Sequence, residues 1–320
     1  MSLLLEHLNK SFANVHAVQD LSLDVKEGAI FGFLGQNGAG KSTTLRMILD
    51  IIRPDSGTIT WNGLPVNKVP RRAWGYLPEE RGLYPKMAVE EQLLFLAQLQ
   101  GVKKAEAQRE LNEWLERFQI TENRKKKVEE LSKGNQQKIQ FLASVLHDPT
   151  ILIMDEPFTG LDPVNVNLLK DAFLEMHRRG KTIIFSTHQM ETVEELCQDI
   201  AIIKQGQLVR YGNLRQIKHA MGRTVVRLAL TDDPTITWLD NMPGVSVTKR
   251  REDYIEMNLT APATPDDILK TALQRGGHVL LFEIAEPSLN DIFIEAMGGS
   301  ETPLSTSQTS RQPQLAAAQG

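Results

Sequence analysis

The segment Gly35–Ser42, with the sequence GQNGAGKS, constrains this chain more than any other, because it fills every fixed position of the pattern G-x-x-x-x-G-K-[ST]. The apolar run Ala29–Leu34 before it is typical of a buried parallel strand, and Ser42–Leu49 after it has the apolar spacing of a helix. A glycine loop between a strand and a helix surrounds phosphates with backbone N–H groups and the positive helix end. A chance match in a glycine-bearing turn is the alternative, and the flanking strand and helix disfavour it.

The loop predicts a nucleoside triphosphate site in which the polar side chains have separate tasks. Lys41 is expected to reach the β- and γ-phosphates, and Ser42 to offer its hydroxyl to Mg²⁺. The predicted nucleotide-binding residues of this segment are Gly35, Gln36, Asn37, Gly38, Ala39, Gly40, Lys41, Ser42 and Thr43.

A second apolar strand, Thr150–Met154, ends in two carboxylates, Asp155 and Glu156, followed by Pro157. Because ligands of open α/β sheets bind at the carboxyl ends of the strands, Asp155 is expected to hold Mg²⁺ through water beside Ser42. Glu156 is then free for chemistry on the nucleotide. A pair of helix-capping carboxylates before Pro157 is the alternative.

The segment Leu131–Lys138 (LSKGNQQK) precedes that strand and leads into a helical pattern. It resembles the signature motif, usually L-S-G-G-Q, of ATP-binding cassette (ABC) ATPases, in which a helix start meets a phosphate bound by the partner subunit. The resemblance assigns Ser132 and Gly134 to that phosphate. Lys133 stands in place of the first paired glycine of the motif, and Asn135 in place of its glutamine. Taken alone, the segment is also compatible with a turn and a helix cap.

The same resemblance gives roles to further residues. Phe12 is similar to the aromatic residue that stacks on adenine, although by itself it also fits a core position of the first strand. Thr159–Asp162 resembles the loop that touches the other subunit of a dimer. His188 follows an apolar strand and resembles the switch histidine, which contacts the γ-phosphate and the attacking water. Glu79 occupies the position of a glutamine that ligates Mg²⁺, in a loop that couples nucleotide state to a membrane partner.

The family mechanism implied by this resemblance uses two subunits that close head to tail over two ATP molecules. Glu156 would orient or deprotonate the attacking water, while Lys41, His188 and the signature donors neutralise charge on the phosphates. The implied cofactors are ATP and Mg²⁺. The implied partners are a second ATP-binding subunit, expected to form a homodimer, and integral-membrane permease subunits.

Composition limits the domain organisation and the cellular compartment of such a protein. A length of 320 residues with 41% hydrophobic residues supports a large core and more than one domain. Every apolar run is shorter than the roughly 20 residues that cross a bilayer, and the single Cys197 suits a reducing compartment. We therefore expect a peripheral protein on the cytoplasmic face of the cell membrane. The net charge of −4 argues against broad nucleic-acid binding, and the basic run Arg124–Lys127 is flanked by acidic residues, which favours a solvated loop.

The resemblance and the motifs that carry it imply an α/β fold: a P-loop ABC cassette with a RecA-like core sheet and a helical subdomain, followed by a small α+β domain. The cassette is expected at 1–215, with its helical subdomain at about 85–148, the accessory domain at 216–299 and a disordered tail, dispensable for hydrolysis, at 300–320. The accessory domain resembles the C-terminal domain of bacterial sodium-extrusion and drug-export ATPases. Its best-matching phrase is Glu286–Phe293 (EPSLNDIF).

The resulting hypothesis is the ATP-hydrolysing subunit of an exporter of sodium, drugs or other small molecules. A soluble ABC ATPase acting on ribosomes or DNA is the alternative from another class. It is disfavoured because the chain has one cassette and no heptad insertion. A non-catalytic nucleotide sensor is disfavoured by the intact Lys41, Asp155, Glu156 and His188.

Overall fold

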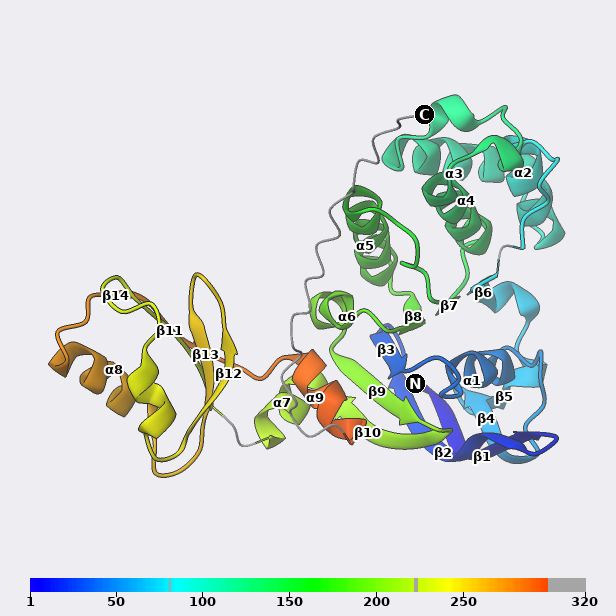
Figure 1. Ribbon diagram of the computed structural model, residues 1–320. Coiled ribbons are helices and arrows are strands. Elements are labelled where there is room, and N and C mark those ends of the chain that lie inside the picture. Colours follow the sequence, from blue (N-terminus) through cyan, green and yellow to red (C-terminus); the bar gives the residue numbers. More distant parts are fainter. Residues whose placement is uncertain (81, 222–223, 299–320) are drawn as a thin grey trace, which may run out of the picture. The chain divides into compact units, whose positions relative to one another are not determined.

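The computed structural model describes residues 1–80, 82–221 and 224–298, so the predicted tail at 300–320 lies outside the described residues. The chain divides into two compact units, each described here by itself (Figure 1). The first contains the chain up to residue 222 and the returning segment Ser288–Ala296. The second contains the stretch between them.

A six-stranded sheet forms the centre of the first unit, with the order β10-β9-β3-β8-β7-β6. The strands from β9 to β6 are parallel, and only β10 runs antiparallel to its neighbour. Every residue of β3, β7 and β8 is buried, as the apolar runs within them predict. The strands are β3 (Ile30–Gly35), β6 (Trp74–Leu77), β7 (Ile151–Asp155), β8 (Thr182–Thr187), β9 (Asp199–Lys204) and β10 (Gln207–Asn213).

A second, antiparallel sheet of order β2-β1-β4-β5 packs on the central sheet through a shared apolar core. Its strands are β1 (Ser2–Phe12), β2 (Val15–Lys26), β4 (Ser56–Trp61) and β5 (Leu64–Pro65). The core also takes in α1 (Lys41–Ile48), whose Leu45 is fully buried. The loop between β3 and α1 is therefore held from both sides by packed elements.

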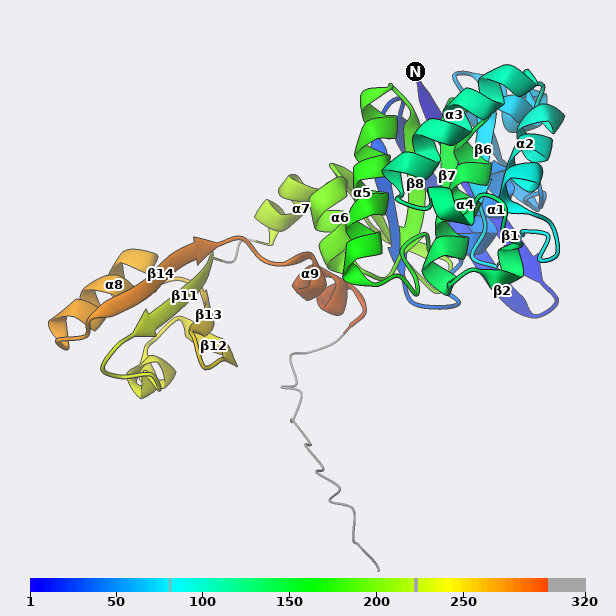
Figure 2. The ribbon, with the colours of Figure 1, turned by 90° about the horizontal axis from the view of Figure 1, so that it is seen from above.

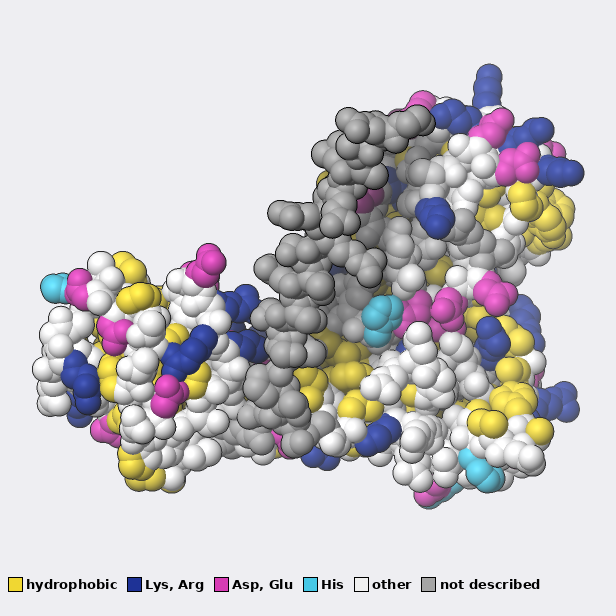
Figure 3. Space-filling view, in the orientation of Figure 1, with side chains coloured by type: hydrophobic (Ala, Val, Ile, Leu, Met, Phe, Trp, Pro, Cys, Tyr) yellow, Lys and Arg dark blue, Asp and Glu magenta, His cyan; other side chains and the backbone are white. Residues whose placement is uncertain are grey.

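A helical subdomain and the helices α5, α6 and α7 also belong to the first unit. Figures 1 and 2 both show α2, α3 and α4 grouped together. Phe141 of α4 packs against Trp114 of α3 and Phe173 of α5, which links the group to the sheet. Phe95 and Leu99 of α2 stay exposed, and Figure 3 shows hydrophobic side chains gathered over that helix. The helices are α2 (Val89–Leu99), α3 (Lys104–Arg117), α4 (Lys133–Val145), α5 (Pro163–Arg178), α6 (Met190–Leu196) and α7 (Leu214–Ala220).

The second unit is a four-stranded antiparallel sheet of order β12-β13-β11-β14 with the α-helix α8 (Pro265–Gln274) and the short 3-10 helix Thr237–Asn241. Apolar side chains of β11 and β13 form its core together with Ile268 and Ala272 of α8. Thr264 caps α8 in a reciprocal pair with Asp267. The strands are β11 (Thr224–Leu230), β12 (Val245–Arg250), β13 (Ile255–Leu259) and β14 (Val279–Ala285).

The last described helix, α9 (Leu289–Ala296), leaves the second unit and packs against α6 of the first (Figures 1 and 2). Leu289 and Ile292, three residues apart on one face, are buried in this contact region. The segment 216–299, expected from the sequence as one accessory domain, thus ends in a helix that belongs structurally to the cassette.

Candidate functional site

The glycine loop follows β3 and opens α1, as its pattern predicts. Lys41, the first residue of α1, is buried, and its Nζ donates hydrogen bonds to the carbonyl oxygens of Gly35 at 2.8 Å and Gln36 at 3.3 Å. Gln36, Asn37 and Gly38 are exposed. The loop therefore has an exposed segment at 36–38, and hydrogen bonds to the loop's own carbonyl oxygens fix the position of Lys41.

Gly40 fixes the loop against the second sheet. Its φ is +104°, a conformation that side chains other than glycine rarely adopt, and an added Cβ would lie 2.3 Å from the carbonyl oxygen of Ala17. Ala17 belongs to β2, which pairs with β1 in the hairpin that contains Phe12. The hairpin and the loop are consequently neighbours.

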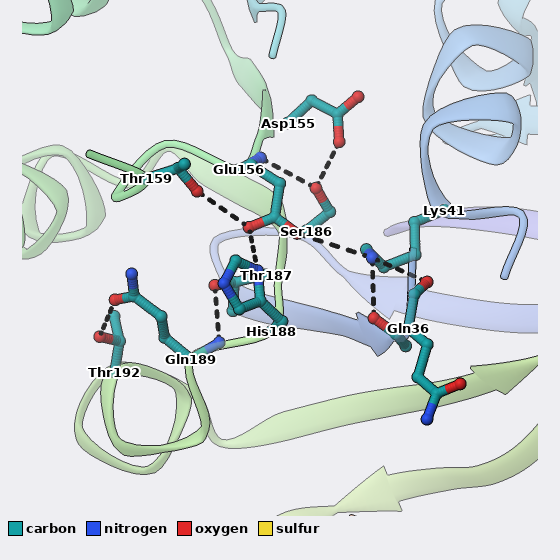
Figure 4. Close-up of polar contacts among 11 residues, drawn as sticks. Gln36, Lys41, Asp155, Glu156, Thr159, Ser186, Thr187, His188, Gln189 and Thr192 are labelled. Atoms are coloured by element: carbon teal, nitrogen blue, oxygen red, sulfur yellow. Dashed lines mark hydrogen bonds and ion pairs between the residues drawn. The ribbon is translucent and has the colours of Figure 1, made fainter. Parts of the chain in front are cut away.

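Two adjacent buried carboxylates lie at the carboxyl end of β7 (Figure 4). Oδ1 of Asp155 accepts a hydrogen bond from Ser186 Oγ at 2.5 Å, and Oε1 of Glu156 lies 3.6 Å from Lys41 Nζ. The second oxygen of Asp155 and the Oε1 of Glu156 are buried without a hydrogen-bond partner. Because buried carboxylate oxygens are normally satisfied, these two atoms have ligand-binding capacity to spare.

His188, directly after β8, completes this group. Its Nδ1 lies 2.9 Å from Glu156 Oε2, which also accepts from Thr159 Oγ1 at 3.3 Å. The Glu156 side chain is 6% exposed, whereas that of His188 is 55% exposed. With the carboxylate as acceptor, Nδ1 is the donor, which leaves Nε2 as the nitrogen available to a ligand.

The backbone of Glu156 is in the left-handed region, with φ at +48°. Its N–H is held by the Ser186 carbonyl oxygen at 3.2 Å and by Ser186 Oγ at 3.0 Å. Such conformations cost free energy and gather at functional sites. Ser186 thus orients the Asp155 carboxylate and holds the backbone of Glu156, a role that the sequence analysis missed. A hydroxyl residue inside an apolar strand, two positions before His188, was the available signal.

The signature segment begins α4. Ser132 is the N-cap, and its Oγ accepts from the N–H of Asn135 at 3.3 Å. Neither Lys133 nor Gly134 has a positive φ, so the backbone accommodates lysine in place of glycine. An added Cβ on Gly134 would lie 3.1 Å from Nδ2 of Asn165 in α5, which is close packing.

The predicted dimer loop ends at Asp162, the N-cap of α5. Its carboxylate accepts a hydrogen bond from the N–H of Asn165 at 3.0 Å, and this bond holds the pKa of Asp162 below its usual value. Because Asn165 also lies beside Gly134, the signature helix and this loop meet at one residue.

Phe12 and Glu79 are both exposed. The Phe12 ring is 45% exposed, with Lys10 Nζ 5.4 Å from its centroid. Glu79 is exposed after β6. Burial raises the pKa of the Tyr76 phenol against the opposing hydrogen bond with Arg46, and the carboxylates of Asp155 and Glu79 add to the rise.

The structure thus brings Lys41, Asp155, Glu156 and His188 together. Within the described ranges, no hydrogen bond or ion pair joins Ser42, Ser132, Gly134, Phe12 or Glu79 to this group. The described part of the chain also contains no cluster of three His, Cys, Asp or Glu side chains arranged to hold a metal. Mg²⁺ in nucleotide sites commonly uses one or two protein ligands together with phosphate oxygens and water. The unpartnered Asp155 oxygen and the half-buried Ser42 at the helix start fit that donor set.

Of the helices that the structure describes, none combines the length and the apolar character needed to cross a membrane.

Comparison with known proteins identifies both parts of the chain. The family model described as ABC transporter matches residues 18–159, and the model described as ATP-binding protein DrrA1-3-like, C-terminal domain, matches residues 212–297. An uncharacterized ABC transporter ATP-binding protein of Bacillus subtilis (strain 168), YhaQ, is 49% identical over 296 residues, which cover 92% of this chain and 98% of that protein.

Two further comparisons, with a relative and with a solved structure, support the same family. The linearmycin resistance ATP-binding protein LnrL of Bacillus subtilis (strain 168) is 31% identical, covering 92% of this chain and 97% of that protein. A solved structure of the ATP binding subunit of an ABC transporter matches with a TM-score of 0.65 at 32% identity, covering 69% of this chain and 94% of that one. The predicted fold class is confirmed. The chain belongs to the ABC transporter ATP-binding proteins and carries a DrrA-like C-terminal domain.

Proposed function

We propose that this protein binds and hydrolyses ATP with Mg²⁺ and thereby energises an exporter whose membrane-spanning permease subunits are separate chains. The observation that carries the proposal is the pair of buried carboxylates with unpartnered oxygens, opposite the buried Lys41 and beside an open glycine loop. In a structural ion-pair network these oxygens would be satisfied by protein donors.

Each residue of the group takes one task in this proposal. Lys41 and the loop N–H groups bind the phosphates, and Asp155, Ser42 and Glu79 hold Mg²⁺, which neutralises charge on the phosphate oxygens when bound. Glu156 accepts the proton of the attacking water. His188, hydrogen-bonded to Glu156, keeps that carboxylate oriented and offers Nε2 to the γ-phosphate. The remaining residues proposed to bind the nucleotide are Phe12, which would stack on adenine, and, for the phosphates, Gly35, Gln36, Asn37, Gly38, Ala39, Gly40 and Thr43.

A second copy of the chain completes the site. Ser132 and Gly134 begin α4 with N–H groups that their own chain does not bring to Lys41, so they serve the nucleotide of a partner subunit. Their neighbour Asn165 connects them to the loop ending at Asp162, which is expected in the same dimer interface. We infer a homodimer in which each nucleotide contacts both copies.

The permease is proposed to dock over α2. A groove of about 540 Å³ is lined by Tyr84, Pro85, Lys86, Met87 and Glu91. Tyr84 is 55% exposed, and hydrophobic side chains gather over α2 (Figure 3). Exposed apolar surface of this kind marks protein contact sites. The groove follows Glu79 in the chain, which gives a short path from the nucleotide to the membrane partner. The protein would then lie at the cytoplasmic face of the membrane.

The export direction and the class of cargo rest on relatives. The DrrA-like domain and the likeness to a linearmycin resistance ATP-binding protein support efflux of a drug or another small molecule. No residue of the cassette selects the cargo in this proposal, because the cargo path lies in the permease.

The first test is ATP hydrolysis by the purified chain with Mg²⁺. The Lys41→Ala variant is expected to lose hydrolysis by on the order of a hundredfold or more, because its ammonium neutralises the phosphates. The matched control is Lys181→Ala. Lys181 pairs with Asp148 at an N···O distance of 2.7 Å, at the amino ends of the strands, whereas the candidate site lies at their carboxyl ends. Equal hydrolysis by the two variants would contradict the assigned site.

The transport part needs a separate measurement. The tagged chain, purified from detergent-solubilised cells, is expected to bring a polytopic membrane protein with it. The Tyr84→Asp variant is expected to lose that partner while retaining nucleotide binding, because a charge replaces the exposed aromatic side chain of the groove. Recovery of ribosomal or DNA-associated proteins instead would favour a soluble ABC ATPase and sink the export proposal.

A further inference from the structure

The helix α6 connects His188 to the far end of the chain. It begins at Met190, two residues after His188, and Gln189 ties its start to the end of β8 through a hydrogen bond from its N–H to Thr187 Oγ1 at 3.0 Å (Figure 4). Thr192 Oγ1 lies 3.4 Å from Gln189 Oε1. A shift of α6 therefore moves the segment that carries His188.

Glu194 of α6 fastens two other helices. Its Oε1 accepts a hydrogen bond from the N–H of Leu289, the first residue of α9, at 2.6 Å. The same oxygen lies 2.7 Å from Nζ of Lys218 in α7. The Glu194 side chain is 29% exposed, and a charge-assisted bond to a helix start is stronger than a neutral one.

Both helices that Glu194 holds adjoin the second unit in the chain. Lys218 lies in α7, which ends at Ala220 before β11 begins at Thr224. Leu289 follows β14, which ends at Ala285. Glu194 is thus the residue to which the outgoing and the returning chain are tied. The phrase Glu286–Phe293, prominent in the sequence but without a role in the proposed chemistry, contains this returning connection.

The start of α9 is stable without Glu194. Ser288 Oγ donates to Asp291 Oδ2 at 2.6 Å, and the N–H of Asp291 lies 3.2 Å from Ser288 Oγ, so the first turn carries its own reciprocal cap. Loss of the Glu194 carboxylate therefore releases a formed helix from α6 rather than melting it.

We propose that Glu194 is a positioning residue for His188: by fastening α7 and α9 to α6 it keeps His188 against Glu156, so that releasing the fastening slows hydrolysis without weakening nucleotide binding. This inference rests on the proposed hydrolysis. It gives the returning helix of the DrrA-like domain a role in setting the rate of the cassette, because any change in the second unit that pulls on α7 or α9 acts on α6.

Cys197 provides a native reporter of α6 that does not depend on hydrolysis. It is the only cysteine of the chain and caps the end of α6. Its thiol is buried against β3, where an added Cβ on Gly32 would lie 3.1 Å from Sγ, and burial raises the pKa of Cys197 well above its usual value. A thiol reagent therefore reaches it only when α6 opens.

The experiment compares three variants of the full chain: Glu194→Ala, Glu194→Gln and Glu195→Gln. Glutamine at 194 keeps an acceptor for the Leu289 N–H. Glu195 is the matched control, because it pairs with Lys170 of α5 at 2.5 Å and makes no bond to α9. Glu194→Ala is expected to speed labelling of Cys197 by about tenfold and to lower kcat by about tenfold, with unchanged affinity for ATP. Glu194→Gln is expected to recover most of both effects, and Glu195→Gln to match the wild type.

A second comparison tests the route through His188. In a His188→Ala background, measured by single-turnover release of labelled phosphate, Glu194→Ala is expected to change the residual rate by less than about twofold, because effects through one residue are not additive. Unchanged Cys197 labelling in Glu194→Ala, or faster labelling with a wild-type kcat, would overturn the positioning role. Absence of hydrolysis by the wild type would contradict the proposed function itself, and with it the role of Glu194 in hydrolysis, whereas the labelling would still report the fastening.

Discussion

Two buried glutamates, Glu156 in the first unit and Glu256 in the second, show how differently the units use charge. Both side chains are 6% exposed. Each oxygen of Glu256 accepts a bond of 2.8 Å, one from Lys249 Nζ and one from Arg227 Nε. Glu156 has one oxygen bonded to His188, while the other lacks a hydrogen-bond partner and lies 3.6 Å from Lys41.

The difference separates a structural charge from a chemical one. A buried carboxylate with both oxygens bonded to cations stabilises the fold that surrounds it, because removing either partner leaves charge uncompensated. A buried carboxylate with an unpartnered oxygen costs stability and persists where a ligand uses it. The same substitution should therefore have opposite consequences in the two units.

The largest effect is expected from Glu156→Gln. The amide keeps the size of the side chain but cannot take a proton from water, so kcat is expected to fall by at least about a hundredfold. ATP binding is retained, and an ATP-dependent closed dimer accumulates, which size-exclusion chromatography with light scattering detects. The free energy of unfolding is expected to change by less than about 1 kcal/mol. Full hydrolysis by this variant would remove Glu156 from the mechanism.

The matched variant, Glu256→Gln, is expected to leave hydrolysis unchanged and to destabilise the second unit by about 2 kcal/mol, since two cations lose their shared carboxylate but can turn partly to solvent. Hydrogen exchange resolved by peptide should show faster exchange in β13 and unchanged exchange in β7. Equal protection of β13 in both proteins would mean that the pairs around Glu256 contribute nothing.

The charge on Glu256 also predicts that the free energy of unfolding of the second unit depends on pH. Burial alone would raise the pKa of Glu256, but the hydrogen bonds from Lys249 and Arg227 outweigh it and hold the pKa below its usual value. Between the folded and unfolded pKa values of Glu256, the folded state therefore binds fewer protons than the unfolded state. The stabilisation is present above the unfolded pKa and is lost as the pH falls through the folded pKa.

The sequence predicted the parts of the site that are contiguous in the chain. Gly35–Ser42 and Asp155 with Glu156 could be recognised because phosphate and metal chemistry needs those residue types at fixed spacing. Ser186 was missed, because its role appears only when β8 pairs with β7 and its hydroxyl reaches the next strand. The return of α9 to α6 was missed for the same reason, since Glu194 and Leu289 are 95 positions apart.

In the fold, too, contiguous features were predicted and features formed by distant segments were missed. Unbroken apolar runs predicted the buried parallel strands, because every side chain of such a strand faces a packed layer. The second sheet, β2-β1-β4-β5, was not predicted as a separate sheet. Its register depends on several irregularities between β1 and β2, where pairing shifts after Leu5, Leu8 and Lys10. The roles of Phe12, Glu79, Ser132 and Gly134 remain predictions, which substitutions at those four positions would test.

A third buried ionisable group, His147 in the first unit, lies outside the candidate site and gives the smallest expected effect. Burial lowers its pKa, against the opposing hydrogen bond between Nε2 and the Trp74 carbonyl oxygen at 2.9 Å. Between the folded and unfolded pKa values the unfolded state binds more protons, so the stability of the first unit falls as the pH drops below the unfolded pKa of about 6.5. From pH 6.5 to 5.5 the loss is expected to be at most about 1 kcal/mol, measured by denaturant unfolding. The loss should disappear in His147→Gln and persist in His219→Gln, because His219 is exposed. A loss that survives His147→Gln would show that His147 does not carry this pH dependence.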